Sequence, residues 1–136
     1  FVGKAQCATC HFLPVFNGTV SPYFRSSEQE ILGVPKDKAG TQLDGDLGRY
    51  VFNTDLDQLK HSFKTPTVRN INESGPYMHN GVYETLEEVM DFYNKGGGLG
   101  LGLKVENQTL PDTPLDLTDQ EIQAIVAFMK ALSDQA

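Results

Sequence analysis

The run Cys7-Ala8-Thr9-Cys10-His11 constrains this chain more than any other feature of its sequence. Cys-x-x-Cys-His is the attachment signature of a c-type haem, in which two thiols bond to the two vinyl groups of one porphyrin. One helical turn between the cysteines places both sulfur atoms at the same edge of the ring. The adjacent His11 then reaches the iron as its proximal ligand. The motif predicts one covalent haem c, held by Cys7, Cys10 and His11.

Two other chemistries use the same residue types. A structural zinc site needs four ligands, usually from two such pairs, and only His61 and His79 could complete one here. Their spacing fits no zinc module. A thioredoxin-like thiol pair needs a βαβ context, which the sequence pattern does not show. Haem attachment is therefore the first interpretation, with zinc and thiol chemistry as the alternatives.

Length and charge narrow the class of protein further. The chain has 136 residues, the size of one ordinary domain, with 18 acidic and 11 basic residues and a formal net charge of −7. This charge argues against nucleic acid or an anionic membrane as a partner. No apolar run approaches the ~20 residues that a membrane-spanning helix needs. The chain starts at Phe1 rather than Met, which indicates a processed or trimmed product.

Helical periodicity is clearest near the end of the chain. Thr85-Leu-Glu-Glu88 is a capping box, and apolar side chains then recur at helical spacing until Lys95-Gly96, a basic last turn followed by glycine. Thr118-Asp-Gln-Glu121 is a second capping box, and it opens a helix with apolar residues on one face through Leu132. Two amphipathic helices are therefore expected here.

The earlier part of the chain predicts mostly loops. Short helices are expected over 2–10 and near Ser27–Leu32, while Gly and Pro punctuate residues 12–63. Residues 96–102 predict a flexible glycine loop. No strand pattern competes, so the fold class expected is all-α, with long irregular loops around one covalent haem.

Three segments carry a family resemblance: Phe63–Asn70 (Phe-Lys-Thr-Pro-Thr-Val-Arg-Asn), Gly75–Gly81 (Gly-Pro-Tyr-Met-His-Asn-Gly) and Thr85–Val89 (Thr-Leu-Glu-Glu-Val). With the turn at Asp46–Tyr50, they resemble the C-terminal half of the bacterial di-haem cytochrome c peroxidases, a family that includes the enzyme MauG. The likeness runs from the haem motif to the last helix. It implies that residues 1–136 form a single cytochrome c domain.

The resemblance also implies a division of labour. In this family another, N-terminal haem domain reduces peroxide, and the C-terminal domain relays electrons to it from a small redox-protein donor. The expected partners are therefore that second haem domain and a donor, in a bacterial periplasm. The alternatives are a free mono-haem electron carrier and a haem sensor.

The resemblance supplies a candidate for the sixth iron ligand. In the peroxidases this ligand is a Met on the helix after the Pro-Tyr-x-His-x-Gly segment, and ungapped counting places Tyr93 at that position. MauG also has a Tyr there. Met78 is the alternative ligand. Met90 is expected in the core, and His79 is expected to hydrogen-bond near the haem.

Other positions have supporting roles. Arg49 and Arg69 are candidates to pair with the haem propionates, and Lys64 is a weaker candidate. The resemblance implies a possible calcium ion, bound by the backbone carbonyls of Ser74 and Pro76. His61, which no motif supports, is expected at the surface.

Overall fold

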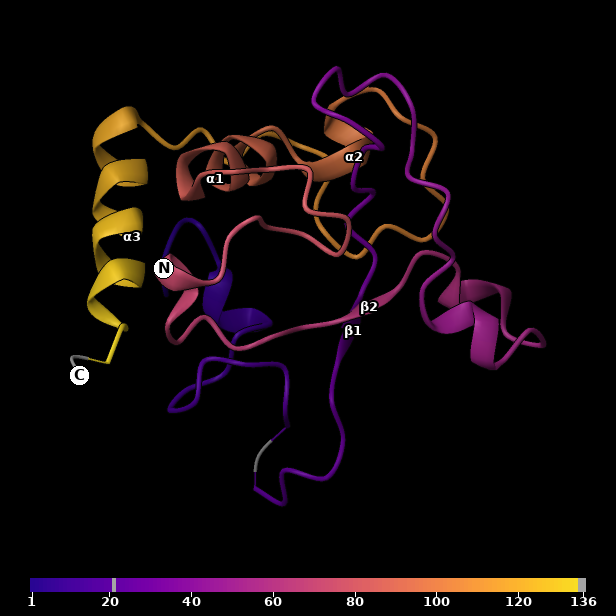
Figure 1. The fold of residues 1–136 in the computed structure, drawn as a ribbon, viewed down its shortest axis with the longest axis horizontal. Helices are drawn as coiled ribbons and strands as arrows, with labels where there is room; N and C mark the ends of the chain where they lie inside the picture. The colour runs from indigo at the N-terminus through magenta and orange to yellow at the C-terminus, as the bar shows by residue number, and fades with distance from the viewer. Residues whose placement is uncertain (21, 135–136) are drawn as a thin grey trace.

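Helices and irregular segments dominate the computed structural model, which describes residues 1–20 and 22–134 (Figure 1). The α-helices are α1 (Leu86–Asn94), α2 (Gly97–Gly100) and α3 (Asp119–Ala131), and the two strands β1 (Gln29–Glu30) and β2 (Phe63–Lys64) pair antiparallel. Short 3-10 helices cover Cys7–Thr9, Arg49–Phe52, Asp57–Leu59 and Ile71–Glu73. Apart from the small sheet, the expectation of a helical domain with long loops is confirmed.

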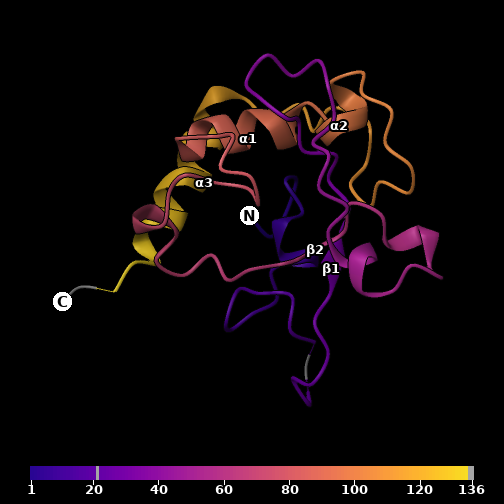
Figure 2. The same cartoon turned by 45° about the vertical axis from the view of Figure 1, so that its right-hand side comes forward.

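Helices α1 and α3 begin where the sequence predicts. Thr85 and Thr118 each accept a hydrogen bond from the backbone N–H three residues on, and Glu88 and Glu121 reach back to the capping residues. The apolar faces of the two helices pack together, and Figures 1 and 2 show α3 beside α1. Their shared core consists of Leu86, Met90, Leu117, Ile125, Val126 and Met129. Burial of this stripe orients α1 and so fixes which of its faces is left for other contacts.

The capping carboxylates predict an acid-dependent loss of stability. Hydrogen bonds from Lys38 and from the N–H groups of Glu84 and Thr85 lower the pKa of Glu88 to about 2. Backbone and side-chain hydrogen bonds from Thr118, with Lys4, lower that of Glu121 to about 2. A carboxyl group whose pKa is lower in the folded chain stabilises the fold above its unfolded pKa, here 4.5. That stabilisation is lost as the pH falls towards about 2.

We therefore expect the urea midpoint of the haem-loaded protein to fall between pH 4.5 and 2, and to fall less in a Glu88→Gln/Glu121→Gln variant. Glutamine keeps the capping geometry without a titrating group. Urea titrations of both proteins across this interval test the expectation. Parallel curves for the two proteins would contradict it.

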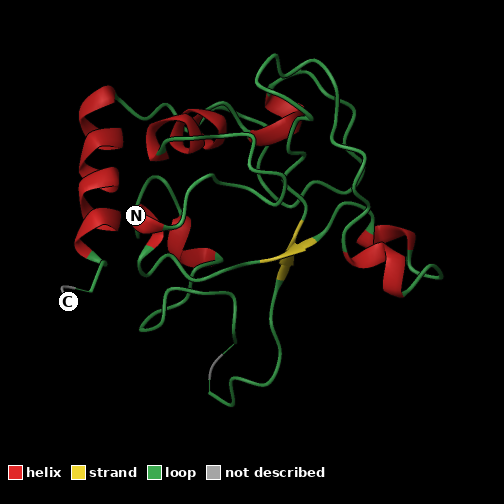
Figure 3. Ribbon diagram, viewed as in Figure 1, coloured by secondary structure: helices red, strands yellow, loops and turns green. Residues whose placement is uncertain are grey.

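The expected helix near Ser27–Leu32 is wrong. Residues Gln29–Glu30 form β1, which pairs with β2 in the register Gln29 to Lys64 and Glu30 to Phe63. Figure 3 shows the two strands crossing in the middle of the loop-rich half. Helix propensity is a weak preference, and pairing with a segment more than thirty residues away outweighs it. Of the helix expected over 2–10, only the turn Cys7–Thr9 is helical.

The glycine run is not a flexible loop. Gly97–Gly100 forms α2, and Gly96, Gly97 and Gly98 are buried. A Cβ atom on Gly98 would collide with the backbone of Gly33, so the glycine allows two chain segments to touch. Gln108 fixes the arrangement by donating to the carbonyls of Gly96 and Leu110.

Among the described residues, no helix is long and apolar enough to cross a membrane.

Candidate haem site

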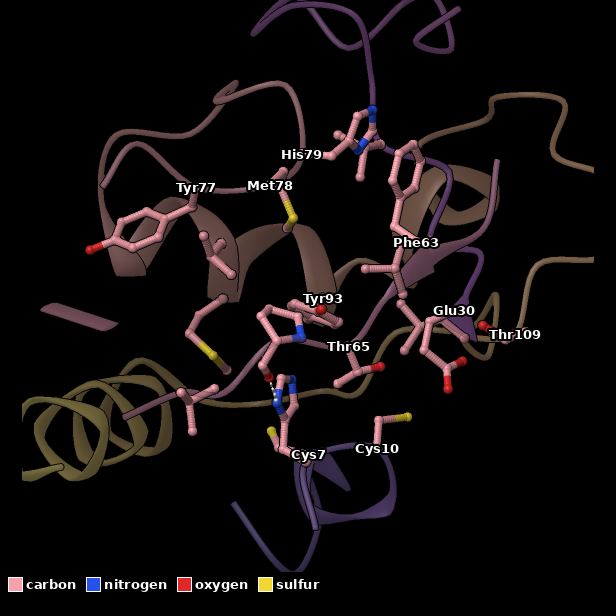
Figure 4. A pocket seen from close by; sticks show the side chains of 18 of the residues that line it. Cys7, Cys10, Glu30, Phe63, Thr65, Tyr77, Met78, His79, Tyr93 and Thr109 are labelled. Carbon is pink, nitrogen blue, oxygen red and sulfur yellow. Dashed lines mark hydrogen bonds between the residues drawn. The ribbon is translucent and has the colours of Figure 1, made fainter. Parts of the chain in front are cut away.

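A cavity of about 550 Å³ lies between the N-terminal turn, the strand pair and α1 (Figure 4). Its volume falls within the roughly 300–1,000 Å³ typical of cofactor sites. The side chains around it come from segments spread along the chain, among them Cys7, Glu30, Thr65, Tyr93 and Thr109. Loops that are far apart in the sequence thus line one common, mainly apolar cavity.

Cys7, Cys10 and His11 all line this cavity. The short helical turn makes this possible, because the N–H groups of Cys10 and His11 both bond to the carbonyl of Cys7, at 3.3 and 2.9 Å. Neither cysteine forms a disulfide. Burial raises the pKa of Cys7, and burial with the Glu30 carboxylate raises that of Cys10 to about 11. These are not the low-pKa thiols that a disulfide-exchange site requires.

His11 is held as a metal ligand would be. Its Nδ1 lies 3.0 Å from the carbonyl oxygen of Pro66 and 3.3 Å from that of Phe16. Both partners can only accept, so Nδ1 carries the hydrogen and donates it, and Nε2 keeps its lone pair. Burial lowers the pKa of His11, which favours the neutral ring. A backbone carbonyl behind the imidazole is the usual outer contact of a ligating histidine.

Tyr93 and Met78 both line the cavity. Tyr93 lies on α1, and burial, with the negative charge of Cys7, Cys10 and Glu30, raises its phenol pKa well above the usual value. The phenolate would therefore need a cation in the cavity to balance it. Met78 has a left-handed backbone with φ of 69°. Figure 4 shows its sulfur directed towards Tyr93, so the structure keeps both candidates for the sixth ligand.

Met90 and His79 occupy the places expected of them. Met90 is a core residue, only 3% exposed, whose side chain also touches the cavity. The His79 ring stacks on Phe63 at a centroid distance of 3.7 Å, and its Nε2 lies 3.2 Å from Asp44 Oδ1. His79 is thus already engaged at the edge of the cavity and is not free to turn towards its centre.

The two arginines proposed for the propionates do not reach the cavity wall. Among the described residues, the basic side chains that line it are Lys64, His11, His61 and His79, and neither Arg49 nor Arg69 is with them. Arg49 lies in the 3-10 helix Arg49–Phe52, and Arg69 is exposed. Their role stays a prediction without support from the geometry.

Ser74 and Pro76, the candidates for backbone calcium ligation, do line the cavity. Ser74 Oγ donates to the carbonyl of Ile71 at 3.1 Å, so its hydroxyl is already used within the turn. The carbonyl groups that a calcium ion would need belong to the backbone, and both residues line the same cavity.

Sequence reasoning missed three wall residues. His61, expected at the surface, is half-buried and lines the cavity, as do Asp44 and Glu30. No local pattern marks them, because they come from separate loops and strands that meet only in the folded chain. Glu30 owes its position to the unexpected strand β1.

The ligand geometry fits a haem better than zinc. Among the described residues, the side chains that gather as a possible metal cluster are Cys10, Glu28 and Glu30, and not the cysteine pair with His61 and His79. The sheet is antiparallel, which removes the βαβ context of a thioredoxin-like site. The cavity instead has the groups that covalent haem c uses. These are the two thiols of Cys7 and Cys10, the imidazole of His11, and a phenol and a thioether from Tyr93 and Met78.

Comparisons with known proteins point the same way. The chain is 35% identical over 149 residues to cytochrome-c peroxidase IdrP2 of Denitromonas iodatirespirans, covering 99% of this chain and 38% of that protein. It is 32% identical over 133 residues to the methylamine utilization protein MauG of Methylorubrum extorquens, covering 97% of this chain and 32% of MauG. No protein-family model matches the sequence.

One solved structure supports the fold directly. A MauG-like protein associated with microbial copper homeostasis superimposes with a TM-score of 0.70 at 26% identity, covering 97% of this chain and 41% of that protein. The chain therefore spans well under half the length of these relatives.

Proposed function

Because this chain is homologous over nearly its full length to one domain of the di-haem cytochrome c peroxidase and MauG family, we propose that it is the haem-c electron-transfer domain of such an oxidoreductase. It would accept electrons from a small redox protein and relay them to a second, peroxide-reducing haem domain. The observation that carries this is a Cys7-x-x-Cys10-His11 turn on the same cavity as Tyr93. The acidic net charge of −7 would attract a donor with a basic surface.

Each residue has a definite part in this proposal. Cys7 and Cys10 would anchor one haem, and His11 would present Nε2 to its iron, held in place by the Pro66 carbonyl. Tyr93 would occupy the sixth position. When bound, the haem supplies reversible one-electron chemistry, while the cavity walls hold water away from it. Attachment through this motif takes place outside the cytoplasm, so a bacterial periplasm is the proposed location.

Calcium is a further part of the proposal. The carbonyls of Ser74 and Pro76 would supply two backbone ligands, with the rest from the second haem domain. Oxygen ligands of this kind suit calcium. Two carbonyls alone would bind it weakly, so calcium is expected to bind only when both domains are present.

The haem-loaded chain tests the division of labour. We expect one covalent haem per chain by mass spectrometry. We also expect rapid reduction by a small c-type cytochrome, because a haem bonded to Cys7 and Cys10 would lie beside the turn Cys7–Thr9, none of whose residues is fully buried. We expect peroxide turnover only after the second haem domain is added. The His11→Ala variant is the control that keeps both cysteines but removes the proposed iron ligand. Full peroxide turnover by the chain alone would contradict the proposal.

A free mono-haem electron carrier is the second candidate, and the position of Met78 favours it. A thioether opposite His11 would stabilise ferrous iron and raise the reduction potential. Near-infrared magnetic circular dichroism of the ferric protein separates the two candidates. A phenolate signature would support Tyr93 and a MauG-like enzyme. A sulfur-to-iron transition would exclude Tyr93 and fit a carrier or a higher-potential electron-entry domain, and a second haem domain in the full protein would then exclude the free carrier.

A further inference from the structure

His61 is one of eight described non-glycine residues with a positive φ. Its φ is +61°, in the left-handed region that costs a non-glycine residue energy. The surrounding chain holds it there, since the His61 N–H donates to the carbonyl of Leu47 at 3.0 Å. The next carbonyl, that of Ser62, accepts from Arg49 at 2.8 Å. These two hydrogen bonds join residues 47–49 to residues 61–62, and Ser62 is only 2% exposed, so this pairing lies in the interior. These contacts fix the backbone from which the His61 side chain extends.

The imidazole ring of His61 is oriented as firmly as its backbone. Nδ1 lies 2.8 Å from the carbonyl oxygen of Asp46, which can only accept, so Nδ1 donates. Within the described part of the chain, Nε2 has no protein partner. The residue is half-buried and lines the haem cavity. One ring nitrogen is therefore anchored to the backbone, and the residue belongs to the cavity wall.

Hydrogen bonds connect His61 to the wall formed by His79. Asp44 Oδ1 lies 3.2 Å from His79 Nε2 and accepts from the N–H of Asp46, whose carbonyl holds His61. Figure 4 shows Cys7 and Cys10 at one end of the cavity, with Phe63 and His79 at the other. His61 therefore belongs to the end of the cavity away from the cysteines.

The structure of the porphyrin indicates that the haem propionates would lie at the end of the cavity away from the cysteines. The two vinyl groups that bond to cysteine sit on one side of the ring, and the two propionates sit on the opposite side. A haem anchored at Cys7 and Cys10 thus directs its carboxylates away from them. Charge-assisted hydrogen bonds are what stabilise a partly buried carboxylate. The arginines do not line the cavity, and His79 is already paired with Asp44. Of the remaining basic side chains on the wall, Lys64 is exposed, whereas His61 is half-buried and held by the backbone.

We propose that His61 is a haem-positioning residue: as an imidazolium, with a hydrogen on each ring nitrogen, it donates from Nε2 to a propionate and from Nδ1 to the Asp46 carbonyl. This inference rests on the proposed haem-binding function. The left-handed backbone of His61 and the hydrogen bonds that join residues 47–49 to residues 61–62 would hold this imidazole near the propionates. Nothing in the residue's local sequence marks it for such a role.

Because the backbone of His61 is left-handed, the imidazole can be removed by substitution with glycine without adding backbone strain. His61→Gly removes the imidazole but suits φ of +61° better than histidine does, so folding should be kept or improved. In the full-length haem-loaded protein, we expect the potential of the haem at Cys7 and Cys10 to fall. The less neutralised propionate would favour ferric iron. A tenfold change in the reduction equilibrium, about 59 mV for one electron, is the expected size. The propionate bending mode in resonance Raman should shift as well.

Two further variants complete the experiment. Asn107→Gly makes the same left-handed-to-glycine change at an exposed position, φ 58°, away from the cavity, and should leave potential and Raman spectrum unchanged. His61→Asn tolerates the same backbone and serves if the glycine variant does not fold. A haem-loaded His61 variant with unaltered potential and propionate mode would overturn the inference. Failure of the unsubstituted protein to attach haem would instead overturn the proposed function.

Discussion

Replacing Tyr93 with Phe is expected to abolish the phenolate-to-iron charge-transfer band of the ferric protein and to raise its reduction potential. A phenolate is an anionic ligand that favours ferric iron, so its loss shifts the balance towards ferrous iron. Axial ligands and their surroundings set haem potentials over about 0.8 V, and we expect a shift that is a sizeable part of this range. Phe keeps the ring and the packing of this face of α1, so the fold should be retained.

Met78→Leu is the matched control for Tyr93→Phe. Both residues line the cavity, and both substitutions conserve volume, but only one removes the proposed ligand. Electronic absorption, near-infrared magnetic circular dichroism and potentiometric titration of both variants provide the measurement. If the ferric spectrum changes in Met78→Leu and stays unaltered in Tyr93→Phe, Met78 is the ligand and the assignment of Tyr93 fails.

A chain made without haem is expected not to reach a native fold. The haem cavity measures about 550 Å³, and its walls come from segments spread along the chain. Without haem, the apolar side chains on its walls would stay in contact with water and would lose the burial that the porphyrin ring provides. A domain of ordinary stability has only about 5–15 kcal/mol in total, so losing this burial is expected to remove the cooperative fold.

Cys7→Ala/Cys10→Ala produced in a haem-attaching host tests this expectation. The variant should lack covalent haem, show little near-ultraviolet circular dichroism and bind a hydrophobic dye, as loosely packed states do. Thr9→Ala, between the two cysteines, is the matched control and should attach haem and fold. A cooperative thermal transition in the haem-free double variant, close to that of the loaded protein, would contradict the prediction.

Sequence patterns predicted the parts of this fold that depend on near neighbours. The capping boxes at Thr85 and Thr118 each operate across three residues, and both helices begin where the boxes place them. The Cys7-x-x-Cys10-His11 turn is equally local, and so the side chains of its cysteines and histidine meet one cavity as expected. Apolar periodicity also placed Met90 in the core correctly.

Contacts between distant segments were beyond these patterns. Strand β1 exists because Gln29–Glu30 meets Phe63–Lys64, and α2 is tightly placed because Gly98 touches Gly33. Neither partner lies within reach of a local pattern, so a helix and a flexible loop were expected instead. The same reason explains why no local pattern placed His61 on the cavity wall.

The sequence by itself predicted the cofactor class, the two long helices and the candidate haem anchors, because each depends on groups within one or two turns of chain. Only the tertiary structure decided what surrounds the proposed haem cavity. The Pro66 carbonyl behind His11, the Asp46 carbonyl behind His61 and the pairing of His79 with Asp44 all join residues 15 or more positions apart. Such contacts form through packing of the whole chain, which no local pattern records.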